Sequence, residues 1–245
     1  MTADTARVAV VTGAAGGIGS AVSRKLAADG YVVACLDVHD SDARRVADEL
    51  PHAIGIAADV SDAASVKAAA ARVRAELGLP WLLVNAAGVF SIQLISELGE
   101  AEWDRILDTN LKGPFLTCRE FLPDMIARHD GCIVNVASTA GVRGGRRRAA
   151  YCASKGGLVQ LTRSLAVDHG PDGVRINCVC PGLIDTAMAD WIRHDEEALT
   201  RWAGTIPARR IGTAGEVADV ISFLASASGS YLHGSVLMVD GGGTA

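Results

Sequence analysis

The sequence predicts an α/β fold in which seven parallel strands form a doubly wound sheet with helices on both faces. Two observations predict it: short runs rich in β-branched residues recur along the chain, and segments with helical periodicity separate them. Strands buried on both faces carry nearly continuous apolar runs, and their crossover connections are right-handed. We expect strands at residues 7–12, 31–37, 53–57, 81–85, 131–136, 175–179 and 235–239.

The clearest helical segment between these strands spans residues 62–77. Its apolar residues Val66, Ala70 and Val73 fall on one face of a helix, as expected for a helix that packs on a sheet. Ser61 stands just before the segment and is placed to cap its first turn. A further helix is expected from Tyr151 to about residue 170.

The length and composition suit a single domain over residues 1–245. Of these residues 49% are apolar, so a large core can be buried, and no linker, repeat or low-complexity segment divides the chain. The formal net charge of −5 argues against a nucleic-acid-binding protein, whose charge would be basic and clustered.

Cysteine and histidine usage indicates neither a metal site nor a disulfide framework. The six cysteines contain no CxxC pair, and most lie inside apolar runs, where reduced, buried thiols are expected. The six histidines are scattered, without an HExxH motif or a His–carboxylate cluster. The apolar run at residues 8–11 is too short for a signal peptide, and no stretch approaches a membrane span. We therefore expect a cytoplasmic protein without a metal.

One long segment interrupts the alternation of strands and helices. Residues 181–215 are polar and aromatic and include Trp191 and Trp202. A compact domain rarely carries so long a connection without a use, and a lid over a ligand is a common one. We expect a substrate lid at about residues 183–214; a surface helix pair that covers the sheet edge is the alternative.

A glycine-rich turn, TGAAGGIG at residues 12–19, follows the first expected strand and opens the first helix. Glycine lets the backbone turn tightly and approach a pyrophosphate, while the helix N-terminus offers N–H donors and the positive end of its dipole. Glycine also serves simply to reverse the chain, but the position of this turn at the first strand-to-helix junction favours nucleotide binding.

Asp37 ends the second expected strand, about twenty residues beyond the turn. A carboxylate there accepts hydrogen bonds from both hydroxyls of an adenosine ribose and repels a 2′-phosphate. Gly16 adds no positive charge near this position, and Arg44 and Arg45 lie too far along the chain to face the ribose directly. The pattern favours NAD over NADP; a helix-capping or solvated aspartate is the alternative.

Tyr151 and Lys155 lie four residues apart at the start of an expected helix, and therefore on one face. A free phenol has a pKa of about 10, and a neighbouring ammonium would lower that pKa toward the range useful for acid/base chemistry. Ser138 follows the fifth expected strand, at the carboxyl end of the sheet, and its hydroxyl is suited to polarise a carbonyl or hold an alkoxide. A tyrosine packed on a lysine stem is the alternative for the pair.

Taken together, these motifs resemble the short-chain dehydrogenase/reductase family in its single-domain, NAD-preferring form. The resemblance covers essentially the whole chain, with the motifs in the family's order and at its normal spacings. The matching motifs are TGAAGGIG at residues 12–19, Asp59 with Val60, NAAG at residues 85–88, Asn110, Ser138, YCASK at residues 151–155 and PGLIDT at residues 181–186. The resemblance implies a Rossmann-like fold and an oxidoreductase that transfers a hydride between NAD(H) and a secondary alcohol or ketone.

The resemblance also implies catalytic roles. Tyr151 would be the general acid/base, and Lys155 would lower its pKa and bind the nicotinamide ribose. Ser138 would orient the substrate oxygen. Asn110, in an expected helix, would hold a water that links Lys155 to solvent as a proton relay.

The implied cofactor contacts extend over most of the motifs. Asp59 and Val60 would contact adenine, residues 85–88 would pass along the adenosine ribose, and Ile184 with Thr186 would hold the carboxamide. The expected cofactor-binding residues are Gly13, Gly17, Ile18, Gly19, Asp37, Asp59, Val60, Asn85, Ala86, Gly88, Tyr151, Lys155, Pro181, Ile184 and Thr186. The family's usual second asparagine is Ala86 here, which puts one local hydrogen bond in question.

Four arginines, at positions 143, 146, 147 and 148, crowd the segment between Ser138 and Tyr151. In related enzymes the position three before the tyrosine often faces the substrate, so Arg148 is expected to join Ser138 and Tyr151 in contacting it and could clamp a carboxylate. A solvated or subunit-interface cluster is the alternative for each arginine. Apolar pocket walls are expected from residues that could equally be plain core packing: Phe90, Val142, Trp191 and Trp202.

Two other functions fit the same motifs. One is a 3-oxoacyl-thioester (acyl carrier protein) reductase, against which Asp37 and Gly16 count because such enzymes usually prefer NADPH. The other is a non-catalytic NAD-sensing regulator, which would be expected to lose part of the catalytic set. The expected partner is a small alcohol or ketone, with no nucleic acid and no membrane, and the resemblance implies a homotetramer. Cyclic alcohols, dihydrodiols, hydroxy acids, sugars and steroids all stay open as substrates.

Overall fold

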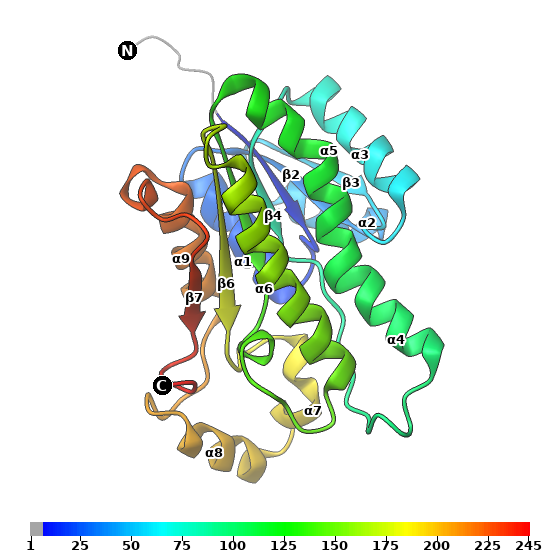
Figure 1. Cartoon of the computed structure of the whole chain (residues 1–245), viewed down its shortest axis with the longest axis vertical. Helices are drawn as coiled ribbons and strands as arrows, with labels where there is room; N and C mark the ends of the chain where they lie inside the picture. Colours follow the sequence, from blue (N-terminus) through cyan, green and yellow to red (C-terminus); the bar gives the residue numbers. More distant parts are fainter. Residues whose placement is uncertain (1–6) are drawn as a thin grey trace.

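A computed structural model describes residues 7–245 and contains one sheet of seven strands, in the order β3-β2-β1-β4-β5-β6-β7 (Figure 1). Every strand pair is parallel. The strands are β1 (Val8–Thr12), β2 (Val32–Asp37), β3 (Ala53–Ala57), β4 (Pro80–Asn85), β5 (Gly131–Val136), β6 (Val174–Pro181) and β7 (Val236–Val239). The expected fold class is confirmed. The largest difference from the expected strands is at β6, which continues through Pro181 because Cys180 and Pro181 still pair with β7.

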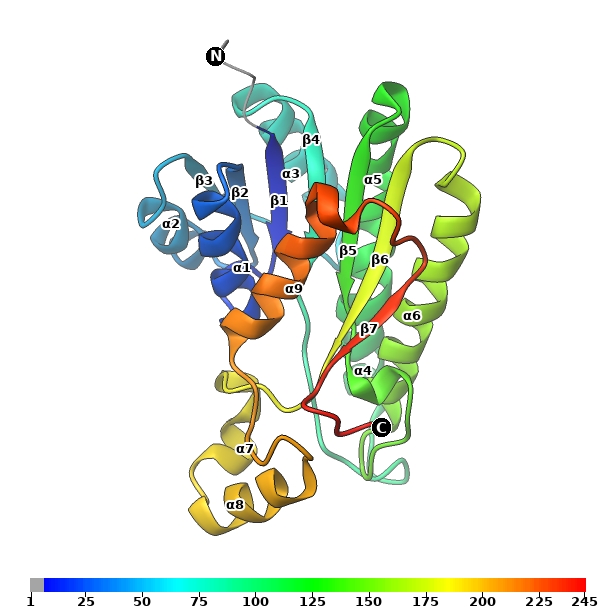
Figure 2. The ribbon, with the colours of Figure 1, turned by 90° about the vertical axis from the view of Figure 1, so that its left-hand side faces the viewer.

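Helices cover both faces of the sheet (Figure 2). One face carries α1 (Gly17–Ala28), α2 (Asp40–Asp48) and α9 (Ala214–Ala225), and the other carries α3 (Ala63–Glu76), α5 (Gly113–Arg128) and α6 (Ala149–His169). The apolar run of β1 is unbroken because its side chains pack on both faces of the sheet. Ala9 and Val11 pack on the face covered by α1, α2 and α9, and Val8 and Val10 pack on the face covered by α3, α5 and α6. Both faces of the strand are buried, as its sequence predicts.

Short helical segments complete the connections. α4 (Glu100–Leu107) runs into α5 through a π-helical turn, Asp108–Lys112, and 3₁₀ turns occur at Thr139–Gly141, Ala187–Ala189 and Ala227–Gly229. No helix within the described residues 7–245 has both the length and the apolar character that crossing a bilayer requires. All six cysteines are free thiols, five of them buried, which confirms the expectation of reduced, buried cysteines.

The cap of α3 differs from the expectation that Ser61 provides it. Asp62 is the N-cap, and its carboxylate accepts hydrogen bonds from the backbone N–H groups of Ala64 and Ser65. Ser61 instead donates its hydroxyl proton to the Asp59 carboxylate, over 2.6 Å. The helix therefore starts one residue later, because a carboxylate in the capping position satisfies two N–H groups at once.

The segment expected to act as a lid forms two helices, α7 (Asp190–Arg193) and α8 (Glu196–Thr205). Both lie beyond the carboxyl ends of the strands, at the same end of the molecule as the chain's C-terminus (Figure 2). No residue of α8 is buried, and the two helices meet through the rings of Trp191 and Trp202, whose centroids are 5.9 Å apart. The segment is thus a peripheral helix pair at the ligand-binding edge of an open α/β sheet.

Candidate active site

The glycine turn between β1 and α1 exposes the start of the helix. The N-cap residue is Gly16, which has an extended backbone and no side chain to cap with, and the first turn of α1 contains no acidic residue. The first N–H groups of a helix have no partner inside the helix, and the helix dipole makes this end positive. The N–H groups at the start of α1 can therefore donate hydrogen bonds to phosphate oxygens.

The glycines of this turn are required by close backbone contacts. Gly13 has a φ of +63°, and a Cβ on it would lie 2.6 Å from the Cα of Ala87. A Cβ on Gly19 would lie 2.0 Å from the carbonyl oxygen of Gly13, and one on Gly17 would lie 2.4 Å from Cγ2 of Thr186. Since real Cβ atoms do not approach so closely, only glycine fits, and the turn packs directly against the segments that contain residues 85–88 and 181–186.

Thr12, which sequence analysis did not single out as a binding residue, connects the turn to the segment after β4. Its hydroxyl oxygen accepts hydrogen bonds from the backbone N–H groups of Ala86 and Ala87, both over 3.2 Å. The backbone at Ala86 is therefore held without the family's second asparagine. The side chain of Asn85 points into the core, where it donates to the side-chain Oδ1 of Asn135 and accepts from the Thr117 hydroxyl.

Asp37 lies beside the glycine turn at the end of β2. One carboxylate oxygen accepts from the N–H of Ala15 and the other from the N–H of Val38, each over 2.9 Å. The carboxylate is thus fixed by backbone donors and keeps lone pairs for further donors. Arg44 and Arg45 of α2 pair with acidic residues near them on the same stretch of chain, since Arg44 lies 2.8 Å from Asp40 and Arg45 lies 3.9 Å from both Asp42 and Glu49.

Asp59 and Val60 follow the carboxyl end of β3. Asp59 is exposed, and its carboxylate accepts from the backbone N–H and the hydroxyl of Ser61. The backbone N–H of Asp59 donates to the hydroxyl oxygen of Ser65. Val60 is buried and packs so close to Gly113 that a Cβ there would lie 2.9 Å from its Cγ2. The backbone of this pair is therefore rigidly placed.

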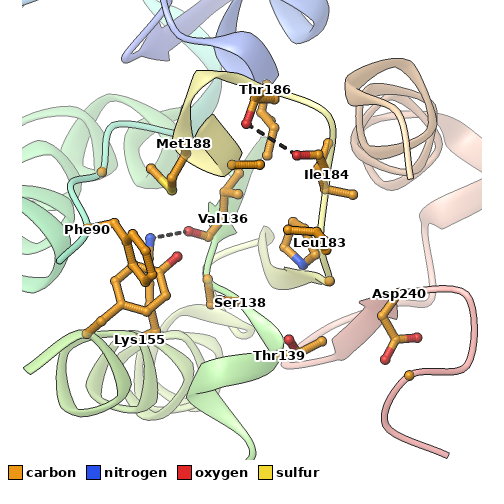
Figure 3. Close-up of a pocket in the computed structure, with 18 of the residues that line it drawn as sticks. Phe90, Val136, Ser138, Thr139, Lys155, Leu183, Ile184, Thr186, Met188 and Asp240 are labelled. Carbon is orange, nitrogen blue, oxygen red and sulfur yellow. Dashed lines mark hydrogen bonds between the residues drawn. The ribbon is translucent and has the colours of Figure 1, made fainter. Parts of the chain in front are cut away.

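Tyr151 and Lys155 project from the first turns of α6 into one pocket. Lys155 donates to the carbonyl oxygen of Val136 over 2.8 Å (Figure 3). Its Nζ lies 5.9 Å from the centre of the Tyr151 ring. A Cβ on Gly88 would lie 3.4 Å from both Lys155 Nζ and Asn110 Oδ1. The expected lysine, tyrosine, asparagine and glycine are thus brought together.

Ser138 faces Tyr151 from the end of β5. It caps the 3₁₀ turn Thr139–Gly141 by accepting the N–H of Ala140 over 3.1 Å, and its hydroxyl lies near enough to the Tyr151 phenol to act against the rise in that group's pKa. Phe90 packs edge-on against the Tyr151 ring, with centroids 4.9 Å apart and planes at 84°. The phenol is consequently held between a hydroxyl and an aromatic edge.

The electrostatics of this pair differ from the sequence-based expectation. Burial raises the pKa of Tyr151 above its usual value, and only the Ser138 hydrogen bond and then the charge of Arg148 act in the opposite direction. Lys155 was expected to lower this pKa, but it is itself fully enclosed, and burial lowers its own pKa to about 8. Without a cofactor, desolvation therefore outweighs the neighbouring charge.

Asn110 lies in the π-helical turn between α4 and α5. Its side-chain oxygen accepts from the N–H of Val89 over 2.8 Å, and its amide donates to the Val89 carbonyl oxygen and to the Ser154 hydroxyl. The π turn moves this side chain out of regular helical register, which is typical of functional sites. Asn110 thereby fixes the chain just after Gly88.

The pocket around these residues joins the cofactor motifs to the lid segment. Its lining includes Ile18 and Thr186 at the glycine turn, the catalytic candidates Ser138, Tyr151 and Lys155, and residues of α7 and α8. Of the expected walls, Phe90, Trp191 and Trp202 line it. Val142 does not and is 43% exposed, so that expectation is wrong: the 3₁₀ turn after Ser138 rotates its side chain outward.

The arginine cluster divides between pocket and surface. Arg143 and Arg148 line the pocket, and Arg143 also donates to the carbonyl oxygen of Gly243 over 3.0 Å. Arg147 forms an exposed ion pair with Glu97, and Arg146 is exposed. Sequence reasoning missed pocket residues that come from the C-terminal segment and the lid, for which no local motif gives a signal: Met188, Ile206, Asp240 and Gly243.

Comparison with known proteins agrees with this arrangement. The family model that matches residues 13–244 is described as enoyl-(acyl carrier protein) reductase. A 2-(R)-hydroxypropyl-CoM dehydrogenase of Xanthobacter autotrophicus is 38% identical over 98% of this chain and 99% of the relative, and a meso-2,3-butanediol dehydrogenase of Serratia marcescens is 38% identical over 98% and 95%.

A solved structure from Beutenbergia cavernae gives the same fold. It is described as an NAD(P)-dependent gluconate 5-dehydrogenase with NADP bound at low occupancy. It is 36% identical to this chain, covers 97% of it and 96% of the solved chain, and superposes with a TM-score of 0.92. The chain therefore belongs to the short-chain dehydrogenase/reductase family of oxidoreductases.

Proposed function

We propose that the protein is an NAD-dependent dehydrogenase that transfers a hydride between the cofactor and a secondary alcohol or its ketone, with Tyr151 as the general acid/base. The observation that carries the proposal is one pocket that contains Ser138, Tyr151 and Lys155 and reaches the glycine turn at Ile18. Two relatives named for secondary alcohols, hydroxypropyl-CoM and 2,3-butanediol, support the substrate class.

The residues of the glycine turn fit a dinucleotide. The backbone contacts at Gly13 and Gly19 exclude side chains, and the cap at Gly16 leaves the first N–H groups of α1 without a side-chain acceptor. When bound, NAD supplies the hydride acceptor for alcohol oxidation and, in its reduced form, the hydride donor for ketone reduction. Gly17, Ile18 and Gly19 would hold its pyrophosphate, and Thr186 with Ile184 its carboxamide.

Asp37 supports NAD rather than NADP as the cofactor. Its carboxylate is fixed beside the turn by two backbone N–H groups, so it would meet a 2′-phosphate as an immobile like charge. Arg44 and Arg45, which lie too far along the chain to face the ribose directly, are also paired with acidic residues. The Beutenbergia cavernae structure, of a protein described as NAD(P)-dependent, holds NADP at low occupancy.

The side chains divide the proton chemistry among them. In oxidation the Tyr151 phenolate would take the hydroxyl proton of the substrate, for whose carbinol hydride NAD would supply the acceptor; in reduction the phenol would give a proton to the alkoxide. The Ser138 hydroxyl donates to the same substrate oxygen. Lys155, whose Nζ lies 5.9 Å from the centre of the Tyr151 ring, would stabilise the phenolate while it keeps its proton. Asn110, beside the same glycine as Lys155 Nζ, would hold the relay water.

We also propose that residues 183–214 act as a substrate lid. Trp191 of α7 and Trp202 of α8 both line the pocket, and α8 has no buried residue, so it can move at little cost in packing. A closing lid would exclude water from the site of proton transfer.

A spectrophotometric screen tests the proposed function. Wild-type protein is incubated with NAD or NADP and a panel of secondary alcohols, and absorbance of the reduced cofactor is followed. Turnover with NAD that is far faster than with NADP is the expected result. Turnover only of 3-oxoacyl thioesters with NADPH would favour the acyl-thioester reductase instead, and NAD binding without turnover of any alcohol, ketone or diol would favour the regulator.

A further inference from the structure

Arg148 is a cation inside the substrate pocket, and no acidic residue within the described part of the chain pairs with it. It lines the pocket together with Ser138 and Tyr151. Within the described residues 7–245, neither an ion pair nor a side-chain hydrogen bond joins its guanidinium to another group, whereas its neighbour Arg147 is paired with Glu97 at 3.2 Å. Burial lowers the pKa of Arg148, and the adjacent charge of Arg143 lowers it further. The five N–H donors of a half-buried guanidinium are thus left for a ligand.

Aromatic rings surround this cation. The centre of the guanidinium lies 5.2 Å from the ring of Phe90, 5.1 Å from that of Trp191 and 5.9 Å from that of Trp202. Ring faces stabilise a cation that has lost water, but they leave its hydrogen-bonding capacity for oxygen acceptors unused. Such an enclosure favours a small ligand that is both anionic and rich in acceptor oxygens.

The backbone and the stem of Arg148 are fixed in advance. The N–H of Gln93 donates to the carbonyl oxygen of Arg147 over 2.8 Å, and Gln93 forms a parallel β-bridge with Arg148. The Arg148 carbonyl oxygen accepts the N–H of Cys152 at the start of α6. Its Cδ lies only 3.0 Å from the position of a Cβ on Gly145, so the stem packs on that glycine. A preorganised donor binds its ligand with less loss of entropy.

Arg148 also lies close to the site of proton transfer. It is the N-cap residue of α6, three residues before Tyr151, and both side chains line the same pocket. Its positive charge acts to lower the pKa of the Tyr151 phenol. A substrate whose oxygen contacts Tyr151 would therefore reach Arg148 through a short linker.

We propose that Arg148, enclosed by Phe90, Trp191 and Trp202, is a subsite for a compact oxyanion group, a carboxylate or a sulfonate, carried by the alcohol substrate a short linker away from its carbinol carbon. This inference rests on the proposed function, because it names the substrate class of the same pocket. It selects short hydroxy acids and hydroxyalkyl sulfonates over the cyclic alcohols, neutral diols and steroids that the sequence leaves open.

Steady-state kinetics with matched substrates test the subsite. Secondary alcohols of equal chain length are compared that end in a carboxylate, a sulfonate or a neutral carboxamide. For wild-type protein, kcat/KM is expected to be about 10- to 100-fold higher for the better of the two anions than for the carboxamide, as for one charged hydrogen-bonded contact. The comparison of kcat/KM between the carboxylate and the sulfonate substrates shows which oxyanion fits the enclosure better.

Variants then assign the preference to Arg148. Arg148→Gln should reduce the anion-to-carboxamide ratio of kcat/KM to near one, and Arg148→Lys, which keeps the charge but loses the planar fork, should retain part of it. Using the ratio removes any effect of the lost charge on Tyr151, because that effect is common to both substrates. Arg146→Gln, an exposed arginine of the same loop, is the matched control and should keep the wild-type ratio.

A binding measurement without turnover separates this inference from the proposed function. Tryptophan fluorescence of the NAD-bound protein is titrated with propionate and with propanesulfonate, which cannot be oxidised at a carbinol carbon. Saturable binding that Arg148→Gln abolishes supports the subsite even if no alcohol is turned over. A wild-type protein that oxidises neutral and anionic alcohols equally well, or a ratio unchanged in Arg148→Gln, would overturn it while leaving the dehydrogenase assignment intact.

Discussion

The two halves of the pocket are built on different principles. The cofactor half, formed by β1, the glycine turn and the end of β2, depends on backbone contacts in which a side chain would collide, as at Gly13 and Gly19. The substrate half is formed by side chains from distant segments, such as Phe90 after β4 and Trp202 of α8. The first half is therefore sensitive to single added atoms and is shared across a family, whereas the second can change its lining without disturbing the sheet.

The largest effect is expected at the most crowded contact of the cofactor half. Gly19→Ala would place a Cβ 2.0 Å from the Gly13 carbonyl oxygen. We expect the free energy of unfolding to fall by about 1–3 kcal/mol through overpacking, and the Kd for NAD to rise more than about tenfold. Thermal unfolding and calorimetric titration measure the two quantities. Gly99→Ala is the control, because nothing lies within 4 Å of its Cβ position; equal behaviour of the two variants would contradict the close-contact argument.

The next effect concerns the selectivity of the same half. Asp37→Asn keeps an acceptor for the Ala15 N–H but removes the charge that faces a 2′-phosphate. The ratio of kcat/KM for NAD over NADP is expected to fall by about 10- to 100-fold. Asp48→Asn, an exposed residue of α2, removes the same charge at the surface and should leave the ratio close to wild type. An unchanged ratio in Asp37→Asn would show that another group selects the cofactor.

A smaller effect is expected in the substrate half. Trp202→Ala removes one ring that lines the pocket and contacts Trp191. The KM for the substrate should rise about 5- to 10-fold, while the Kd for NAD changes less than about threefold. Leu199→Ala changes the same helix outside the pocket lining and serves as the control. An equal loss of NAD affinity in Trp202→Ala would mean that the two halves are not separable.

The smallest effect is a titration at the boundary between the halves. Burial lowers the pKa of Lys155 to about 8, so its ammonium should be lost as the pH rises through this value in the cofactor-free protein. Carbon-13 NMR of labelled lysine side chains should show a resonance with a midpoint near 8 that is absent from Lys155→Met. A Lys155 resonance that is still unshifted at pH 9 would contradict the enclosure of this ammonium.

The sequence predicted the strand, turn and helix start that form the cofactor half, and the reason is local. A buried strand, a glycine turn and a terminal aspartate are consecutive in the chain, so spacing alone brings Gly13, Gly19 and Asp37 together. The sequence predicted Ser61 as the N-cap of α3, whereas Asp62 is the N-cap. Serine and aspartate can both cap a helix and are adjacent here, so only the hydrogen bonds of the first backbone N–H groups decide between them. That decision needs coordinates.

The substrate half was predicted only in part because its residues meet through tertiary packing. The four arginines at positions 143, 146, 147 and 148 look alike in sequence, yet Arg143 and Arg148 line the pocket whereas Arg146 and Arg147 do not. The pKa of Tyr151 was expected to fall, but burial, to which the Phe90 ring contributes, raises it. Environment, not residue type, determines these outcomes.

The role of Tyr151 is tested most directly by single-turnover hydride transfer in Tyr151→Phe, which removes one hydroxyl from a ring that keeps its contact with Phe90. Protein saturated with NAD is mixed with a substrate alcohol, and formation of the reduced cofactor is followed by absorbance. We predict a rate at least about 10³-fold below that of wild type, with NAD affinity retained, as for loss of a general base. A rate within tenfold of wild type would contradict the assignment of Tyr151 as the acid/base.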